Sequence, residues 1–188
     1  MGVFSYYGKV KALAKRFSLS YNSFMPILAS NSVEFISHSP EQTRRLGLRL
    51  GTLLNSGDLL CLSGDMGAGK TTFVQGLAQG WGSVDPVSSP TYVIVNQYHN
   101  PVGVILHHLD CYRLLNAAEA WDLDLDMMLE QGAMVIEWPE KVREVLPDEC
   151  IWVDIQWVDD EKRQFMFHAE GKRYEELLTT FRRAAFGG

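Results

Sequence analysis

The feature that most constrains the fold is the glycine-rich segment at residues 64–71, which reads Gly-Asp-Met-Gly-Ala-Gly-Lys-Thr. It matches the pattern GxxxxGK[ST] at every fixed position. It directly follows the apolar run 59–62, which predicts a buried strand, and it opens the segment 71–79, which predicts a helix. Glycines let consecutive backbone N–H groups converge on a phosphate, and the positive end of the helix points at the same anion. The segment therefore predicts a phosphate-binding loop of the Walker A type.

The residues of this loop predict which ligands it holds. The ammonium group of Lys70 is expected to neutralise β- and γ-phosphate oxygens, and the Thr71 hydroxyl is expected to bind Mg2+. We therefore expect ATP and Mg2+ as ligands and count Lys70 among the catalytic residues. The residues expected to contact the nucleotide are Gly64, Asp65, Met66, Gly67, Ala68, Gly69, Lys70, Thr71 and Thr72.

A loop of this type also needs a carboxylate at the end of a neighbouring strand. Two acids qualify, because Asp110 ends the strand-like run 104–109 and Glu137 ends the apolar run 133–136. We expect Glu137 to complete the magnesium shell beside Thr71. We expect Asp110 to act on the attacking water and to couple the state of the nucleotide to partner proteins.

Three further features near these acids are ambiguous. The segment 86–91 lies where nucleotide switches offer a hydroxyl to the γ-phosphate, but Ser-Pro-Thr is also typical of a stiff turn. Arg113 fits either a charge stabiliser or a surface arginine. His107 and His108 are given no metal role, because adjacent residues of a strand point to opposite faces.

The pattern of predicted elements favours an α/β layer fold. A helix should begin at Ser39-Pro40, with Gln42 in the third helical position, and end near residues 55–57. The segment 71–79 should end as a helix at Gly80. The remaining predicted helices are 116–129 and 173–185, and the predicted strands are 32–37, 59–62, 92–98, 104–109, 133–136, 150–158 and 164–169.

Composition excludes several classes of protein. Of the 188 residues, 46% are hydrophobic, yet no apolar run approaches the roughly 20 residues that span a bilayer. The three cysteines, Cys61, Cys111 and Cys150, form no CxxC pair and no zinc-spaced cluster. We therefore expect a soluble cytoplasmic chain without membrane association, disulfide framework or structural zinc.

Charge separates a basic leader, residues 1–24, from an acidic body, residues 25–188. Four of the 17 basic residues and no acid lie in the leader, so the body holds 13 basic against 23 acidic residues. The leader fits a targeting segment, an adhesive helix, a tail or an overlong gene start before Met25. The body is expected to form the single P-loop ATPase domain. Its acidity disfavours independent binding of a nucleic acid, because like charges repel.

Four motifs together resemble one known family. The segments GDMGAGKTT, SSPTYVIVNQY, HHLDCYRL and VIEWPE, in this order and spacing, are similar to those of the bacterial TsaE (YjeE) family, small P-loop ATPases of tRNA threonylcarbamoyladenosine synthesis. The resemblance covers residues 32–170. One departure is that relatives often show His-Phe-Asp-Leu-Tyr-Arg where residues 108–113 read His-Leu-Asp-Cys-Tyr-Arg. The departure changes only apolar neighbours of Asp110.

The resemblance implies a three-layer P-loop NTPase fold with a mostly parallel central sheet and an antiparallel hairpin. It also implies a helper ATPase that acts with TsaD and TsaB in the modification of adenosine 37 of tRNAs that read ANN codons, and that meets tRNA only through this complex. By motif, Asp110 and Glu137 are the family's acids and Trp138 lies close to the nucleotide. Thr43 and Arg163, the latter beside Lys162, fall where relatives approach the adenosine.

Other P-loop proteins remain alternatives. A small-molecule kinase of this size usually carries an arginine-rich lid, and between Asp110 and Pro147 only Arg113 and Arg143 are present. A regulatory GTPase is disfavoured because no [NT]KxD motif occurs. A nucleotide-dependent scaffold with negligible turnover is the third alternative.

Overall fold

The computed structural model describes residues 31–186. The basic leader, residues 1–24, lies outside the described residues, and so does the start of the predicted ATPase domain at Met25. Within the described part of the chain, no helix is both long enough and apolar enough to cross a lipid bilayer.

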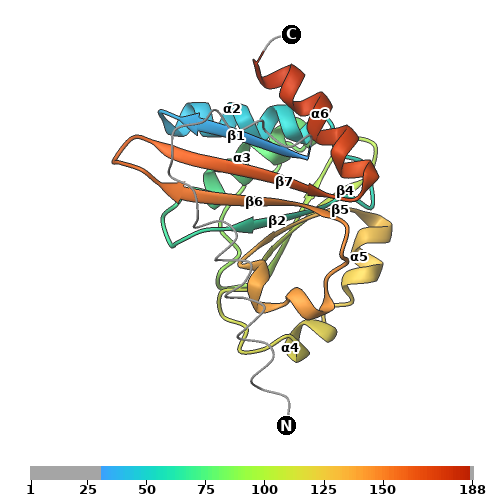
Figure 1. The fold of residues 1–188 in the computed structure, drawn as a ribbon. Coiled ribbons are helices and arrows are strands. Elements are labelled where there is room, and N and C mark those ends of the chain that lie inside the picture. Colours follow the sequence, from blue (N-terminus) through green and yellow to red (C-terminus); the bar gives the residue numbers. More distant parts are fainter. Residues whose placement is uncertain (1–30, 187–188) are drawn as a thin grey trace.

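The described residues form a three-layer α/β fold around a seven-stranded mixed sheet (Figure 1). The order of the strands is β1-β7-β6-β2-β5-β4-β3. The four central strands β6, β2, β5 and β4 are parallel, whereas β3 pairs antiparallel with β4, and β7 pairs antiparallel with β6 and β1. The bounds are β1 Ser32–Ser37, β2 Leu59–Ser63, β3 Val95–His99, β4 Ile105–Asp110, β5 Gly132–Glu137, β6 Cys150–Trp157 and β7 Arg163–Glu170. The prediction of an α/β fold with a parallel centre is confirmed.

Three helices cover one face of the sheet, namely α2 (Pro40–Gly51), α3 (Lys70–Trp81) and α6 (Lys172–Phe186). Helix α2 starts where the sequence predicts, because the Ser39 hydroxyl accepts a hydrogen bond from the Gln42 N–H at 3.2 Å. The Gln42 side chain in turn accepts from the His38 N–H at 2.8 Å. Phe73 of α3 packs its ring 5.6 Å from that of Phe165 in β7, which fixes the helix against the sheet.

Helices α2 and α3 approach each other along four glycines. A Cβ at Gly76 would collide with the backbone carbonyl of Arg44, and a Cβ at Gly80 would collide with that of Leu48. The other two are Gly47 and Gly51 of α2. The prediction that Gly80 ends the helix is therefore wrong: α3 continues to Trp81 and is capped by Gly82, because Gly80 serves the contact between the helices.

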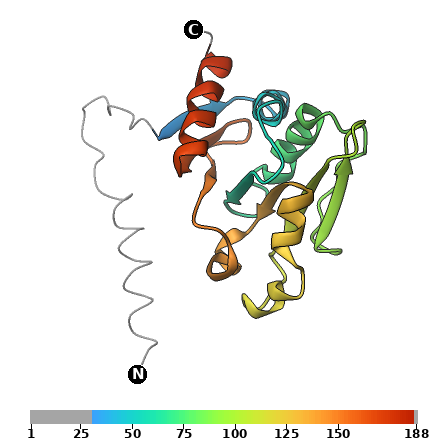
Figure 2. The same cartoon turned by 90° about the vertical axis from the view of Figure 1, so that its right-hand side faces the viewer.

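The opposite face of the sheet carries shorter elements. They are α4 (Ala118–Trp121), α5 (Leu125–Gln131) and two 3-10 turns, η1 (Pro139–Lys141) and η2 (Arg143–Val145). The prediction of one helix over residues 116–129 is wrong, because Asp124 adopts a left-handed backbone with φ of 51° and separates α4 from α5. Figure 2 shows these elements on the far side of the sheet from α2 and α3.

Two other predicted boundaries differ by three residues or more, and the remaining ones agree to within one residue. Helix α2 ends at Gly51 rather than near residues 55–57, because the Asp58 carboxylate accepts from the Asn55 N–H at 2.7 Å and holds a turn there. Strand β3 begins at Val95 rather than at Tyr92, because residues 91–94 form a turn that ends at Ile94 with φ of 71°.

The three cysteines are free and buried. Cys61, Cys111 and Cys150 belong to the core on the α4–α5 face. Burial raises the pKa of the Cys111 thiol to about 12, so this thiol stays protonated at neutral pH.

Candidate functional site

The phosphate-binding loop connects β2 to α3 at the carboxyl end of the parallel strands. Gly69 stands immediately before α3 with φ of 107°, a left-handed conformation that favours glycine. Gly64 has φ of 139°, and a Cβ there would collide with the carbonyl of Ile155 in β6. The loop thus passes close to the backbone of β6 at Ile155, and no side chain caps the first turn of α3. This leaves backbone N–H groups at the positive end of a 12-residue helix.

Lys70 is held inside this loop. Its side chain is buried, and Nζ donates to the carbonyl oxygens of Gly64 at 2.6 Å and Asp65 at 3.0 Å. The same ammonium lies 4.1 Å from the centre of the Trp138 ring. Burial lowers the pKa of Lys70, and the charges of Glu137 and Asp110 oppose that shift. Lys70 and both predicted acids line the same cavity.

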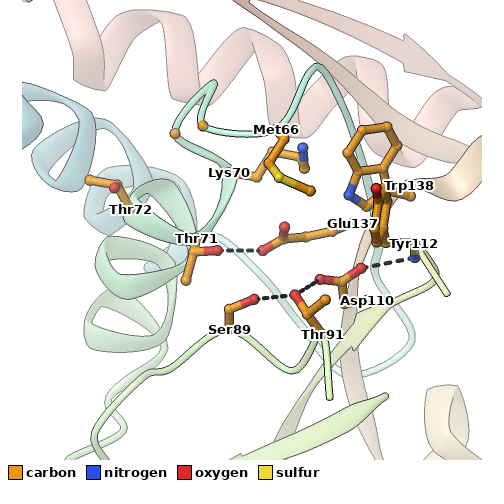
Figure 3. A pocket seen from close by; sticks show the side chains of 12 residues that line it. Met66, Lys70, Thr71, Thr72, Ser89, Thr91, Asp110, Tyr112, Glu137 and Trp138 are labelled. Carbon is orange, nitrogen blue, oxygen red and sulfur yellow. Dashed lines mark hydrogen bonds between the residues drawn. The ribbon is translucent and has the colours of Figure 1, made fainter. Parts of the chain in front are cut away.

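The two predicted metal ligands contact each other (Figure 3). The Thr71 hydroxyl donates to Oε1 of Glu137 at 3.0 Å, and only 3% of Glu137 is exposed. Hydroxyl and carboxylate oxygens are donors that Mg2+ prefers. Among residues 31–186 no cluster of three or more His, Cys, Asp or Glu side chains could hold a metal by itself. The donor set thus fits a magnesium ion that also binds phosphate oxygens, rather than an ion caged by protein alone.

Asp110 lies beside Glu137, because the two are register partners in the parallel pair β4–β5. One carboxylate oxygen of Asp110 accepts from the Thr91 hydroxyl at 2.5 Å, and the other accepts from the Tyr112 N–H at 2.9 Å. The Thr91 oxygen also lies 2.7 Å from that of Ser89. The segment 86–91 therefore brings its hydroxyls to the predicted catalytic acid, which is more than a simple turn would do.

These side chains line one cavity of about 240 Å³ (Figure 3). Nine predicted residues form its wall, namely Met66, Gly67, Gly69, Lys70, Thr71, Thr72, Asp110, Glu137 and Trp138, together with Ser89, Thr91 and Tyr112. The Tyr112 and Trp138 rings pack with their centres 5.0 Å apart. Of the remaining loop residues, Gly64 and Asp65 line a neighbouring cavity on the other side of Trp138, and Ala68 is buried in the core.

The two residues predicted near the adenosine do not line this cavity. Thr43 is buried in α2, and its hydroxyl lies 2.8 Å from that of Ser37. Arg163 lies near the phosphate-binding loop, because its Cγ is 4.0 Å from the position that a Cβ on Gly69 would take. Its Nη1 donates to the Asp159 carbonyl at 2.7 Å. Contact of Thr43 and Arg163 with a nucleotide stays a prediction.

Arg113 also lies outside the cavity wall. Its guanidinium stacks over the exposed Tyr92 ring at 4.4 Å. Both alternatives for Arg113, charge stabiliser and surface arginine, therefore stay open.

Sequence reasoning missed His108. Its side chain is fully buried, and Nε2 lies 3.0 Å from Oε1 of Glu137. The sequence does contain a signal for His108, because it lies two residues before Asp110 on the same strand and so shares the face of that acid. What the sequence alone does not show is that β5 places Glu137 next to that face.

Comparisons with known proteins agree with this geometry. The family model described as "Threonylcarbamoyl adenosine biosynthesis protein TsaE" matches residues 37–165. The chain is 40% identical over 141 residues to the tRNA threonylcarbamoyladenosine biosynthesis protein TsaE of Bacillus subtilis, a match that covers 74% of this chain and 87% of that protein. It is 35% identical over 130 residues to the TsaE protein of Treponema pallidum, which covers 69% of this chain and 95% of that protein.

A solved structure supports the same assignment. The crystal structure of YdiB from Bacillus subtilis superposes with a TM-score of 0.68 at 32% sequence identity, and the match covers 81% of this chain and 95% of YdiB. The family model spans all four strands of the parallel centre and the loop, acids and cavity described above. On sequence, fold and site, the chain belongs to the TsaE family.

Proposed function

We propose that the chain binds and hydrolyses ATP as an accessory protein in the synthesis of N6-threonylcarbamoyladenosine at position 37 of tRNAs that read ANN codons. The observation that carries the proposal is the convergence of Lys70, the Thr71–Glu137 pair and Asp110 on one cavity at the phosphate-binding loop. The names of the TsaE relatives support the biosynthetic process.

The residues of the cavity divide the work of ATP hydrolysis. Lys70 releases its carbonyl partners and donates to β- and γ-phosphate oxygens, while backbone N–H groups of the loop hold the β-phosphate. Thr71 and Glu137 hold Mg2+, which when bound neutralises charge on the phosphates. Trp138 closes one side of the cavity and limits the access of water to Lys70.

Asp110 positions the attacking water in this proposal. Its carboxylate faces the cavity next to Glu137 and is held by Thr91 and the Tyr112 N–H. A carboxylate so held accepts a proton from water as a general base does. Because Thr91 belongs to the segment 86–91, a change at Asp110 on hydrolysis moves that segment and signals the state of the nucleotide.

TsaD and TsaB are the proposed protein partners, and the chain contacts tRNA only through their complex. The acidic body, with 13 basic against 23 acidic residues in 25–188, supports this division because a phosphate backbone is repelled by net negative charge. The buried free thiols support a reducing, cytoplasmic setting.

Phosphate release tests the proposal. The chain alone should hydrolyse ATP slowly, and addition of TsaD and TsaB should raise the rate in the presence of Mg2+. Transfer of phosphate to a small acceptor instead of water would identify a small-molecule kinase. An ATP-dependent complex with TsaD and TsaB that releases no phosphate would identify a scaffold and contradict the hydrolytic part of the proposal.

A further inference from the structure

A buried chain of hydrogen bonds leads away from the proposed magnesium site. Oε1 of Glu137 lies 3.0 Å from Nε2 of His108, and Nδ1 of the same ring lies 3.1 Å from the Tyr98 hydroxyl. The exposed fractions of Tyr98, His108 and Glu137 are 2%, 0% and 3%. These three side chains come from neighbouring strands β3, β4 and β5 and are shielded from water.

The far end of this chain reaches the segment 86–91. The Tyr98 hydroxyl donates to the carbonyl oxygen of Ser88 at 3.2 Å. Nδ2 of Asn96 donates to the same carbonyl at 3.1 Å. The segment is thus tied to both acids, through Thr91 to Asp110 and through Tyr98 and His108 to Glu137.

Each bond of the chain has a donor and an acceptor. An ionised Glu137 only accepts, so Nε2 of His108 carries a proton and donates to it. A carbonyl also only accepts, so the Tyr98 hydroxyl donates to Ser88, and the Tyr98 oxygen faces Nδ1 of His108 as an acceptor. His108 and Tyr98 therefore link Glu137 to the Ser88 carbonyl through continuous hydrogen bonds.

We propose that His108 is a positioning residue that holds Glu137 for Mg2+ beside Thr71 and, through Tyr98, couples the occupied metal site to the segment 86–91. The proposal rests on the proposed binding of Mg-ATP. Groups that orient a metal ligand set its geometry and its basicity, and their loss typically weakens metal binding 10- to 100-fold. A change in the Glu137 carboxylate when it binds Mg2+ passes to Tyr98 and to the Ser88 carbonyl through the same bonds.

Two substitutions at His108 separate its two bonds. In His108→Gln the side-chain amide takes the place of Nε2 and keeps a donor to Glu137. In His108→Asn the amide takes the place of Nδ1, near Tyr98, and does not reach Glu137. His107→Asn is the matched control, because it removes the neighbouring buried ring on the opposite face of β4.

The first measurement is ATP affinity by calorimetry, with Mg2+ and with EDTA. We expect the ratio of ATP affinity with Mg2+ to that with EDTA to be about tenfold smaller in His108→Asn than in the wild type. The affinity for metal-free ATP should be unchanged. His108→Gln and His107→Asn should keep the wild-type ratio. If His108 were purely structural, its substitution would change the ATP affinity equally with Mg2+ and with EDTA. An unchanged ratio of the two affinities in His108→Asn therefore overturns the positioning of Glu137.

The second measurement is amide hydrogen exchange of residues 86–94 with and without Mg-ATP. Tyr98→Phe keeps the ring and deletes the bonds to His108 and Ser88. It should keep the Mg2+ effect on affinity but lose most of the slowing of exchange that Mg-ATP produces in the wild type. A wild-type response in Tyr98→Phe overturns the coupling. This variant also decides the proposal if circular dichroism shows that His108→Asn does not fold.

The wild type separates failure of this inference from failure of the proposed function. A wild-type chain that binds no ATP overturns the proposed function. A wild type that binds ATP more tightly with Mg2+, together with a His108→Asn variant that does the same, overturns only the role of His108.

Discussion

The two faces of the central sheet differ in whether their buried polar side chains have hydrogen-bond partners. Two adjacent residues of β4 show the difference. His108 points to the α2–α3 face and bonds both to Glu137 and to Tyr98. His107 points to the α4–α5 face, and within residues 31–186 both of its ring nitrogens are buried without a hydrogen-bond partner. The first face is covered by helices of 12, 12 and 15 residues, whereas the second is covered by helices of four and seven.

The buried polar side chains that line the site lie on the face with the longer helices. On the first face long helices pack on the sheet, with the rings of Phe73 and Phe165 in contact, and Glu137 and Asp110 both accept hydrogen bonds. The second face contributes packing, and its one buried histidine is a cost to stability. We therefore expect changes at the buried polar side chains of the first face to alter ligand binding and hydrolysis, and changes at His107 on the second face to alter stability alone.

The largest expected effect is that of Lys70→Ala. Its ammonium is positioned to donate to phosphates, so its loss removes charge-assisted hydrogen bonds and should weaken ATP binding about 1000-fold, or about 4 kcal/mol. The melting temperature should change little, because the side chain contacts only loop carbonyls and the Trp138 ring. Calorimetry with the exposed control Lys172→Ala checks both points, and an unchanged ATP affinity in Lys70→Ala would remove the phosphate-binding role.

Next comes Gly76→Ala, which tests how closely the first face is packed. A Cβ at this position meets the Arg44 carbonyl of α2, so the helices must separate. We expect a loss of about 3 kcal/mol in the free energy of unfolding, even though alanine favours helices over glycine. Urea unfolding measures it, and Gln79→Ala on the exposed side of α3 is the control. Equal stability of the two variants would mean that the α2–α3 contact is loose.

Asp110→Ala should lower partner-stimulated hydrolysis about 100-fold, or about 2.7 kcal/mol, while ATP still binds. Asp110 acts on the nucleophile in the proposed mechanism, whereas Glu137 and Thr71 hold the metal. Phosphate release with TsaD and TsaB, measured beside the exposed-acid control Asp122→Ala, checks this prediction. Normal hydrolysis by Asp110→Ala would show that the two acids do not divide the work in this way.

The smallest effect is expected on the second face. Burial lowers the pKa of His107, and nearby His99 adds to that shift, so the folded protein keeps this ring neutral. The unfolded chain takes up a proton as the pH falls below about 6.5, the ordinary pKa of histidine, so this contribution to stability is present above that pH and is lost on acidification.

His107→Leu removes both the titration and the unpartnered nitrogens. It should stabilise the fold by about 1 kcal/mol at pH 7 and flatten the decline in stability between pH 7 and 5. Denaturant titrations across this range measure the effect, with His38→Leu on the exposed surface as control. An identical pH profile in His107→Leu would show that this histidine is not buried at a cost.

Local chemistry made part of the fold predictable from sequence. The start of α2 at Ser39 and Pro40 follows from capping, which involves only neighbouring residues. The buried strand β2 follows from an unbroken apolar run. Gly80 was misinterpreted as a helix end because its role depends on α2, which lies nearly 30 residues earlier in the chain. The break at Asp124 gave no glycine or proline signal.

Site residues were likewise predictable where local motifs determine them and not where they depend on contacts between distant segments. Lys70, Thr71, Asp110 and Glu137 were predicted together because a motif fixes the loop and parallel strands end at one edge of a sheet. His108 and Tyr98 were missed because their contacts depend on the register of three strands. Thr43 was placed by resemblance alone, and in the structure it is buried in contact with Ser37.

Calorimetric titration of ATP into the wild type and Glu137→Ala, each with Mg2+ and with EDTA, tests whether the Thr71–Glu137 pair on the first face of the sheet is a magnesium site next to bound phosphate. With such a site, Mg2+ tightens ATP binding to the wild type at least tenfold, and Glu137→Ala keeps metal-free binding but loses this gain. A Glu137→Ala variant that still gains the full tightening from Mg2+ would contradict the magnesium site.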